Sequence, residues 1–274
     1  MLFSIITINY NNSEGLKNTI HSVINQKDAD FEYIVIDGGS TDQSKSIIEK
    51  NSSHIAYWVS ESDRGIYHAM NKGISASQGD YLLFLNSGDV FKNETILNHA
   101  SRECFNNLDI YYGDLEIEKN GIFSRETYPD TLTFSYFYHK GYLPHPSTFI
   151  KRDLFNRVYY YNEDFKIVGD WDFLVCALCK HNATYRHIDL VISKYKTDGI
   201  SSNSKMRPVL LKEKQISLSN NFPLFMEDSK ELINYRNLFQ MRRYKLLHKL
   251  ESNKLARKVN SVWLRMMSVM FKTK

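Results

Sequence analysis

The stretch FEYIVIDGGSTD, residues 31–42, carries the pattern that decides the fold. Its first half, from Phe31 to Ile36, is an apolar run rich in residues that favour β-strands. Its second half is a turn containing residue types that begin helices, and a helix is predicted directly after it over Ser44 to Lys50. The stretch therefore predicts a strand, a tight turn and a helix in succession, which is the building unit of α/β proteins.

The same order of strand, turn and helix occurs on both sides of that stretch. Upstream, residues 3–8 predict a strand, and the next helix has one apolar face formed by Leu16, Ile20, Val23 and Ile24. Downstream, residues 55–59 and 81–85 predict two more strands with a helix over residues 66–75 between them. Apolar strands that alternate with helices predict a mostly parallel sheet with helices on both faces.

Each of the four predicted strands is followed by a loop rich in amide and carboxylate side chains. The loops are residues 9–11 (NYN), 37–39 (DGG), 60–65 (SESDRG) and 86–89 (NSGD). Ligands of such sheets bind where the carboxyl ends of the strands meet, so we expect one crevice lined by all four loops. The sequence has neither a GxxxxGK[ST] phosphate loop nor a GxGxxG fingerprint. Acidic loops that face a phosphate instead predict an intervening divalent cation, Mg²⁺ or Mn²⁺.

The composition excludes several classes of protein. With 274 residues, 42% hydrophobic and 24% charged, the chain is too long for a small disulfide-stapled scaffold and too apolar for a disordered protein. Three cysteines, Cys104, Cys176 and Cys179, are predicted to be reduced thiols of a cytosolic protein. The CxxC that two of them form lies in an apolar helical run, which favours buried thiols over a redox or zinc site. The short apolar N-terminus predicts a strand and not a signal peptide, and no run is long enough to span a membrane.

The positive charge of the chain is concentrated at its C-terminus. The whole sequence has 35 basic and 31 acidic residues, whereas residues 240–274 contain ten basic residues and one acidic residue. Apolar residues that include Trp263 and Phe271 alternate with these charges at helical spacing. Basic amphipathic helices of this kind favour docking on an anionic membrane surface, although a helix packed on the α/β domain is an alternative. We expect no nucleic-acid partner, because aromatic residues are few in this segment and the predicted crevice is acidic.

Four motifs in order resemble one known family. Residues 4–11 (SIITINYN), 35–42 (VIDGGSTD), 63–73 (DRGIYHAMNKG) and 79–89 (GDYLLFLNSGD) resemble the family-two inverting glycosyltransferases, which have the GT-A fold. The match is to bacterial members that build cell-surface polysaccharides, and it covers residues 1 to about 200. The resemblance implies a transferase domain over residues 1–204, with a nucleotide-sugar-binding half (1–113) and an acceptor and catalytic-base half (114–204). A basic helical extension is then expected over residues 205–274.

The resemblance also implies roles for individual residues on the donor side. Thr7 and Tyr10 match positions that line the nucleoside pocket, and Asp37 matches the carboxylate that accepts from the base. Asp63 and Arg64 match a third nucleotide-contacting loop. The family's metal-binding DxD motif corresponds to residues 86–89, where Asn and Gly replace the two aspartates, so that Asp89 is the one carboxylate left to meet a metal.

On the acceptor side the resemblance implies a catalytic base at Asp170, which must deprotonate an acceptor hydroxyl as it attacks the sugar. The local sequence alone equally fits a helix-capping aspartate at this position. Asp172 is a weaker candidate, and His145 resembles a residue that shapes the acceptor side. Gly199 and Ser201 resemble a loop that closes over the diphosphate.

Together these roles imply an enzyme that transfers a sugar, with inversion, from a UDP-sugar to a hydroxyl of a lipid-linked saccharide. The expected location is the cytoplasmic face of the inner membrane, and the expected cofactor is Mn²⁺ or Mg²⁺. Because the metal-binding motif has lost two of its aspartates, an alternative stays open. The chain could be a catalytically weak subunit that binds sugar nucleotides in a polysaccharide assembly complex.

Overall fold

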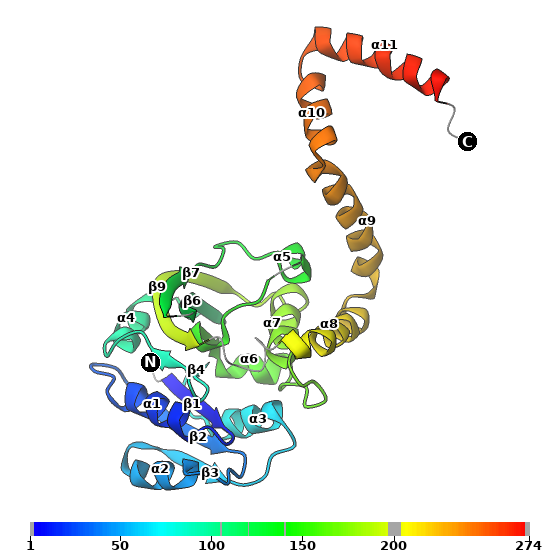
Figure 1. Cartoon of the computed structure of the whole chain (residues 1–274). Helices are drawn as coiled ribbons and strands as arrows, with labels where there is room; N and C mark the ends of the chain where they lie inside the picture. Colours follow the sequence, from blue (N-terminus) through cyan, green and yellow to red (C-terminus); the bar gives the residue numbers. More distant parts are fainter. Residues whose placement is uncertain (1–2, 105, 120, 140, 197–203, 272–274) are drawn as a thin grey trace. The chain divides into compact units, whose positions relative to one another are not determined.

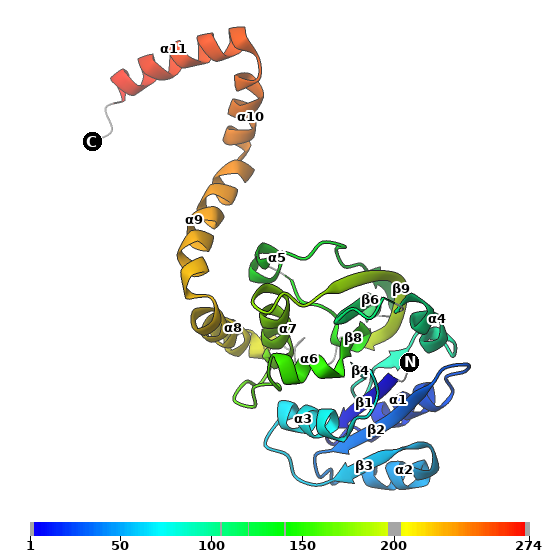
Figure 2. The ribbon, with the colours of Figure 1, turned by 180° about the vertical axis from the view of Figure 1, so that it is seen from behind.

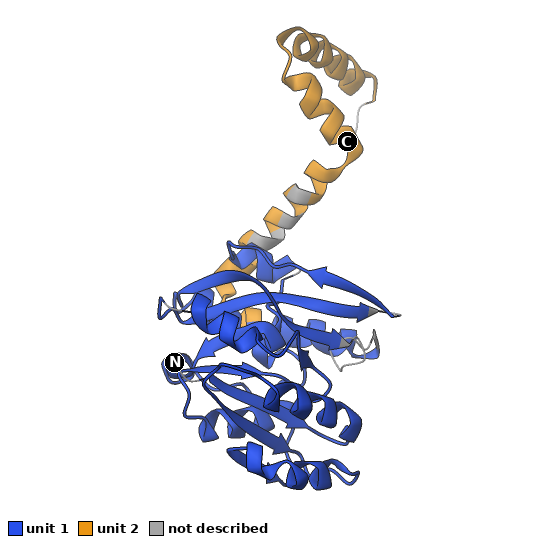
Figure 3. Ribbon diagram, turned by 90° about the vertical axis from the view of Figure 1, so that its left-hand side faces the viewer, with its two compact units in different colours: residues 1–217 blue, residues 218–274 orange. Residues whose placement is uncertain are grey.

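The computed structural model describes residues 3–104, 106–119, 121–139, 141–196 and 204–271. It divides into two compact units, Met1–Ser217 and Leu218–Lys274 (Figure 3). The first unit extends beyond the boundary predicted at residues 204 and 205. The physical reason is that Glu213 and Ser217 form hydrogen bonds with residues of the first unit, so the start of the expected extension belongs to that unit.

The first four strands are parallel and agree with the predicted ones. They are β1 (Phe3–Asn9), β2 (Phe31–Asp37), β3 (Tyr57–Ser60) and β4 (Tyr81–Phe84). The third strand begins two residues later than predicted. In the register of the sheet Asn9 is paired with Asp37 and Asp37 with Ser60. Three polar residues therefore lie side by side at the carboxyl ends of neighbouring strands.

Helices cover both faces of this part of the sheet (Figures 1 and 2). Phe3 and Ile5 pack in a buried cluster with one face of α1 (Ser13–Ile24) and with residues of α2 (Ser44–Lys50) and α4 (Ile96–Glu103). Ile6 points to the opposite face and meets α3 (Ile66–Ala76), where an added Cβ on Gly73 would lie 2.5 Å from Ile6 Cγ2. Only a glycine at position 73 permits this close approach of α3 to β1.

The second half of the first unit extends the same sheet. Its strands are β5 (Val90–Phe91), β6 (Ile110–Lys119), β7 (Ile122–Glu126), β8 (Thr148–Lys151) and β9 (Tyr185–Lys196). The order is β3-β2-β1-β4-β8-β6-β9-β5, with β7 paired to β6. Strand β8 is antiparallel to both β4 and β6, and β9 is parallel to β6. The predicted mostly parallel, helix-flanked α/β sheet is confirmed, with β5, β7 and β8 as its antiparallel members.

Three α-helices accompany these strands: α5 (Phe134–His139), α6 (Arg152–Arg157) and α7 (Gly169–Cys179). Short 3₁₀ helices lie at Ser52–His54, His145–Ser147 and Ser204–Met206, the last just before α8 (Arg207–Asn221). Cys176 and Cys179 lie on α7 as free thiols, and burial raises the pKa of each to about 11. A thiol with a raised pKa is a poor nucleophile and metal ligand. The prediction of buried helix thiols is confirmed for Cys176, whereas Cys179 is half-buried.

The second unit contains α9 (Pro223–Gln240), α10 (Arg242–Glu251) and α11 (Lys254–Met270), so the predicted helical extension is confirmed. The N-cap of α11 is Asn253, whose side chain accepts hydrogen bonds from two backbone amides of the first turn. Neither α10 nor α11 has a buried residue among its described positions. Within the described part of the chain, every helix is too short or too polar to cross a membrane.

Candidate active site

Asp37 holds three of the predicted loops together. Its Oδ1 accepts from Asn9 Nδ2 (2.7 Å) and Ser40 Oγ (2.6 Å), and its Oδ2 accepts from the Ser40 amide (3.0 Å) and Ser60 Oγ (2.6 Å). A carboxylate offers about four acceptor positions, so those of Asp37 are filled, and the residue is fully buried. Burial alone would raise the pKa of Asp37, but the hydrogen bonds from its three neighbours outweigh that effect and lower it. Asp37 is therefore an ionised loop-fixing group, and it can accept from a base only by exchanging one of these donors.

Tyr10 and Asp63 come together around Gly38. An added Cβ on Gly38 would lie 3.3 Å from the Tyr10 ring and 3.1 Å from Asp63 Oδ2, so the two side chains flank this glycine. The Tyr10 side chain is 68% exposed, which leaves its ring face free for stacking. The structure thus places these two donor-side candidates next to each other at the carboxyl edge of the sheet.

Thr7 lies beneath that surface and not on it. The residue is fully buried, and its hydroxyl donates to the Leu85 carbonyl oxygen (2.7 Å) and accepts from the Tyr33 hydroxyl (3.0 Å). Thr7 points toward the α1 face of the sheet because side chains alternate along a strand, and no ligand at the strand ends can reach it in this structure. The position does not support the predicted contact of Thr7 with a nucleoside.

The fourth loop adjoins the first. Asn12 Nδ2 donates to the Ser87 carbonyl oxygen (3.1 Å), and Ser87 Oγ donates to the Asn12 carbonyl oxygen (3.2 Å). Thr19 Oγ1 donates to the Asp89 carbonyl oxygen (2.8 Å) and fixes the end of the loop against α1. The prediction that all four loops meet at one edge is confirmed.

The fourth loop supplies the oxygen atoms that a metal would need. Asp89 is largely buried, and Asn86 Oδ1 is a buried oxygen that has no hydrogen-bond partner among the residues described. Within those same residues there is no group of three or more His, Cys, Asp or Glu that could hold an ion. This donor set fits a Mg²⁺ or Mn²⁺ ion that takes its other ligands from a diphosphate and water, and it does not fit an all-protein metal cage.

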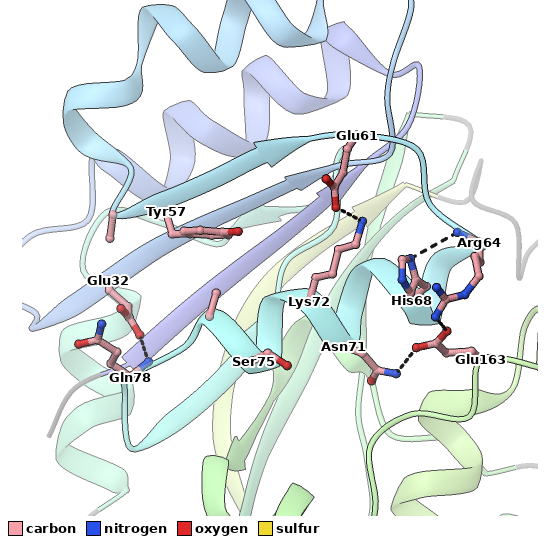
Figure 4. Close-up of a pocket in the computed structure, with 12 residues that line it drawn as sticks. Glu32, Tyr57, Glu61, Arg64, His68, Asn71, Lys72, Ser75, Gln78 and Glu163 are labelled. Atoms are coloured by element: carbon pink, nitrogen blue, oxygen red, sulfur yellow. Dashed lines mark hydrogen bonds and ion pairs between the residues drawn. The ribbon is translucent and has the colours of Figure 1, made fainter.

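Helix α3 connects the donor-side loops to the rest of the site. Lys72 Nζ lies 2.7 Å from Glu61 Oε1 (Figure 4). The same ammonium lies 2.5 Å from Asp63 Oδ1, and His68 Nδ1 lies 3.0 Å from that Asp63 oxygen. Residues 68 and 72 are one helical turn apart, so both face Asp63 from the same side of α3. Sequence reasoning had no role for His68, and the structure gives it one as a partner of Asp63.

Arg64 is paired to the second half of the unit. Its Nη2 lies 2.5 Å from Glu163 Oε2, and Asn71 Nδ2 donates to Glu163 Oε1 (3.1 Å). The Arg64 side chain is 71% exposed, and an exposed ion pair contributes little stability. The guanidinium can therefore leave Glu163 for a phosphate at small cost.

A cavity of about 600 Å³ lies between β3 and α3 (Figure 4). Its wall includes Glu61, Arg64, His68 and Lys72 but none of Asp37, Asp89 or Asp170. The cavity therefore borders the predicted crevice at the loop after β3 and does not coincide with it.

Asp170 stands in the first turn of α7, where Tyr67 of α3 meets it. The Tyr67 hydroxyl donates to Asp170 Oδ1 at 2.9 Å. The contact depends on Gly169, because an added Cβ there would lie 2.9 Å from the Tyr67 ring. Burial and the Asp170 carboxylate both raise the pKa of Tyr67 well above its usual range, so the hydroxyl stays protonated and remains a donor. Asp170 itself is only partly buried and can meet a ligand.

Asp172 faces the opposite way into the protein. It is almost fully buried and accepts from the Tyr159 hydroxyl (2.8 Å) and from Ser217 Oγ. Burial raises the pKa of Asp172, opposed by these two hydrogen bonds. The structure therefore gives Asp172 a structural place in the packing of α7 and α8.

His145 belongs to a buried aromatic cluster near Asp170. Its ring stacks on Phe84 (centroids 4.7 Å apart), and its Nε2 lies 2.9 Å from the Tyr161 hydroxyl. Burial lowers the pKa of His145 and favours the neutral ring, although the Asp170 charge opposes this. His145 therefore packs beneath the site, and its buried ring is not placed to contact a ligand. Gly199 and Ser201 lie outside the described residues.

Several residues of the site carried no sequence-based assignment. Tyr67, His68 and Lys72 lie within the quoted stretch 63–73, and the one-turn spacing of His68 and Lys72 on a helix was the signal that could have found those two. Glu163 had no such signal, because its partners Arg64 and Asn71 are distant from it in sequence.

Fold and site define an α/β protein with a polar site at the carboxyl ends of its strands and a carboxylate at the start of a following helix. The chain belongs to glycosyl transferase family 2, whose family model matches residues 4–164. It is 28% identical over 222 residues to the PGL/p-HBAD biosynthesis glycosyltransferase of Mycobacterium tuberculosis, covering 79% of this chain and 85% of that protein. It is 31% identical over 205 residues to an uncharacterized glycosyltransferase of the same species, covering 73% of this chain and 77% of that protein.

Solved structures share the fold. The S. aureus TarS 1-349 complex with UDP-GlcNAc superposes with a TM-score of 0.63 at 20% identity, covering 81% of this chain and 68% of that one. The chain spans 39% of a longer TarS structure. The mannosyltransferase PcManGT of Pyrobaculum calidifontis, solved with GDP-Man and Mn²⁺, has a TM-score of 0.56 at 12% identity over 95% of this chain and 87% of that one. These likenesses establish the GT-A fold, and with the family they make the chain a glycosyltransferase.

Proposed function

We propose that this glycosyltransferase moves a sugar, with inversion, from a nucleoside diphosphate sugar to a hydroxyl of a saccharide acceptor, with Asp170 as the base. The observation that carries the proposal is the position of Asp170 at the start of α7, partly accessible and oriented by the Tyr67 hydroxyl at 2.9 Å. Inverting transfer is a single in-line displacement that needs one carboxylate near the attacking hydroxyl. Tyr67, protonated and buried, holds that carboxylate in one orientation.

The donor side is supported by the loop residues. Tyr10 offers an exposed ring for a base, Asp63 is fixed beside it, and Arg64 has a guanidinium that can turn toward a phosphate. Asp37 keeps these loops in place. We take UDP as the nucleotide, and support for this comes from the TarS neighbour, which was solved with UDP-GlcNAc.

The metal is part of the proposal. Asp89 and Asn86 Oδ1 would hold Mg²⁺ or Mn²⁺ together with the diphosphate. Support comes from the buried Asn86 Oδ1, which has no hydrogen-bond partner in the described part of the chain. When bound, such an ion stabilises the charge that develops on the leaving diphosphate. The neighbour PcManGT was solved with Mn²⁺.

The acceptor is proposed to be a lipid-linked saccharide of cell-surface polysaccharide synthesis, reached from the cytoplasmic membrane face. Support comes from α11, where apolar side chains at helical spacing are more than half exposed: Leu255, Val259, Val262, Trp263, Met266 and Met270. Basic residues lie on the other side of the same helix, as in interfacial helices. Several such residues near an anionic surface contribute roughly 1 kcal/mol each.

Deleting residues 240–274 tests the membrane part of the proposal. We expect the shortened chain to lose sedimentation with vesicles of anionic lipid and to keep donor binding. Equal sedimentation of the full and shortened chains would contradict membrane docking, and vesicles of neutral lipid provide the control.

A catalytically weak sugar-nucleotide-binding subunit is the second candidate, favoured by the single carboxylate of the fourth loop. An NMR assay with a panel of UDP-sugars, Mn²⁺ and a saccharide acceptor separates the two. An enzyme of the proposed kind gives UDP and a product with inverted anomeric configuration. Binding of a UDP-sugar without any transfer or hydrolysis would favour the second candidate, and a retained configuration would overturn the inverting mechanism.

A further inference from the structure

Lys214 of α8 is a partly buried cation beside the proposed base. Its Nζ lies 4.4 Å from the centroid of the Trp171 ring, and Trp171 directly follows Asp170. The ring is fixed in turn, because its Nε1 donates to the Gly141 carbonyl oxygen at 2.9 Å. None of the ion pairs found among the described residues includes Lys214, and the Asp170 carboxylate is near enough for its charge to raise the pKa of Lys214.

The residues on either side of Lys214 anchor this turn of α8. Glu213 is buried and accepts from the backbone amides of Lys166 (2.9 Å) and Ile167 (3.0 Å), just before α7. Ser217, one turn further along, donates to Asp172 on α7. Lys214 is therefore held against α7 by its neighbours and is not a freely moving surface lysine.

A charged lysine in a partly buried position costs free energy unless an anion or another partner binds its ammonium. Burial lowers the pKa of Lys214 to about 8, although the Asp170 charge opposes the shift. The Trp171 ring offsets part of this cost, because an indole face attracts a cation that lies over it. A neutral side chain at this position would avoid the free-energy cost of burying a charge. An ammonium placed beside the reacting carboxylate is therefore suited to binding an anionic ligand.

We propose that Lys214 binds an oxygen of a substrate diphosphate next to Asp170. The inference rests on the proposed function, because it takes Asp170 as the group at which transfer occurs. Two sources of that diphosphate are chemically equivalent at the lysine: the diphosphate of the nucleotide sugar, and the diphosphate that would join a saccharide acceptor to its lipid. An ammonium is a suitable point charge for either one.

Protection from acylation tests the proposal on the full, unsubstituted chain. Labelling with an acetyl N-hydroxysuccinimide ester at pH 8, read by peptide mass spectrometry, gives the rate at each lysine. The probes are inorganic pyrophosphate, UDP and geranyl diphosphate. We expect at least one of them to slow labelling of Lys214 about fivefold or more, with no change at the exposed Lys212 of the same helix.

The pattern among probes distinguishes the sources. Protection by UDP supports binding of the donor diphosphate, and protection by geranyl diphosphate without UDP supports binding of the acceptor diphosphate. If calorimetry shows that UDP binds the chain but no probe slows labelling of Lys214, the inference is wrong while the proposed function stands. If UDP and UDP-sugars do not bind at all, it is the proposed function that fails.

Variants provide an independent measurement. Lys214→Gln is expected to weaken binding of the protecting probe about tenfold, which corresponds to about 1.4 kcal/mol. Lys214→Arg should keep the affinity within about threefold, since it preserves the charge, and Lys212→Gln should have no effect. Unchanged affinity of a folded Lys214→Gln variant would overturn the inference.

Discussion

The two halves of the site differ in how completely their central carboxylates are hydrogen-bonded. Asp37, on the donor side, is fully buried and accepts four hydrogen bonds from three neighbours. Asp170, on the other side, is partly accessible and accepts one side-chain hydrogen bond, from Tyr67, among the described residues. A carboxylate with its acceptor positions filled can organise loops but has no free position for a proton, whereas Asp170 keeps one oxygen available. The comparison indicates that one carboxylate, Asp37, fixes the donor-side loops, and that a different one, Asp170, is available to take up a proton.

The sharpest way to break this comparison is to remove the charge of Asp170. In Asp170→Asn we expect turnover to fall by about 10³-fold or more, because an amide cannot accept the hydroxyl proton. Steady-state transfer of sugar from the donor measures the effect. The exposed Asp164→Asn is the matched control and should keep nearly full turnover. Near-normal turnover of Asp170→Asn would remove Asp170 from its proposed role.

Removing Asp37 should act on stability. Asp37→Ala leaves the donors of the buried Asn9 and of the half-buried Ser40 and Ser60 without their acceptor, and each such loss costs about 1 kcal/mol or more. We expect the free energy of unfolding to fall by about 3 kcal/mol in urea denaturation. Asp42→Ala, at an exposed turn, serves as the control with a smaller loss. A loss below about 1 kcal/mol for Asp37→Ala would show that its hydrogen bonds do not hold the loops.

Tyr67 tests whether orientation of the base matters. Tyr67→Phe removes the hydroxyl that donates to Asp170 and keeps the ring that packs on Gly169. A hydrogen bond to a charged group contributes roughly 1.5 kcal/mol or more, so we expect kcat to fall about tenfold with donor affinity unchanged. The exposed Tyr57→Phe should be unaffected. If donor affinity falls and kcat does not, Tyr67 belongs to the binding half instead.

The smallest effect is a pH dependence of stability. The pKa of Asp37 is lower in the folded chain than its ordinary value of 3.8. The unfolded chain therefore takes up this proton first as pH falls, and the stabilisation is present above pH 3.8 and is lost below it. The difference in unfolding free energy between the unsubstituted chain and Asp37→Asn should be constant above about pH 5 and shrink below pH 3.8. A difference that grows on acidification would contradict the lowered pKa.

Local sequence was sufficient for much of the fold. The helix predicted at Ser44–Lys50 is found at those residues, and four parallel strands follow from apolar runs between turn residues. The meeting of the four loops also followed from sequence, because parallel strands bring their carboxyl ends to one edge. The position of Asn9 beside Asp37 is a direct result of the β1–β2 register.

Contacts between distant segments could not be predicted in this way. Tyr67 and Asp170 are 103 positions apart, and their contact requires β4 to pair with the antiparallel β8 before the chain reaches α7. Thr7 was assigned to the surface by its motif position, whereas the alternation of side chains along β1 directs it into the core. Glu213 and Ser217 join α8 to residues of α7 and of the segment before it, and the composition of the chain does not indicate these contacts.

The central claim is that Asp170 acts in the reaction and not in donor binding. Isothermal titration of a UDP-sugar that the unsubstituted chain binds, into Asp170→Asn with Mn²⁺ present, tests it most directly. We predict a dissociation constant within about twofold of that of the unsubstituted chain. A weakening of more than about tenfold, equal to about 1.4 kcal/mol, would contradict the division between the two carboxylates.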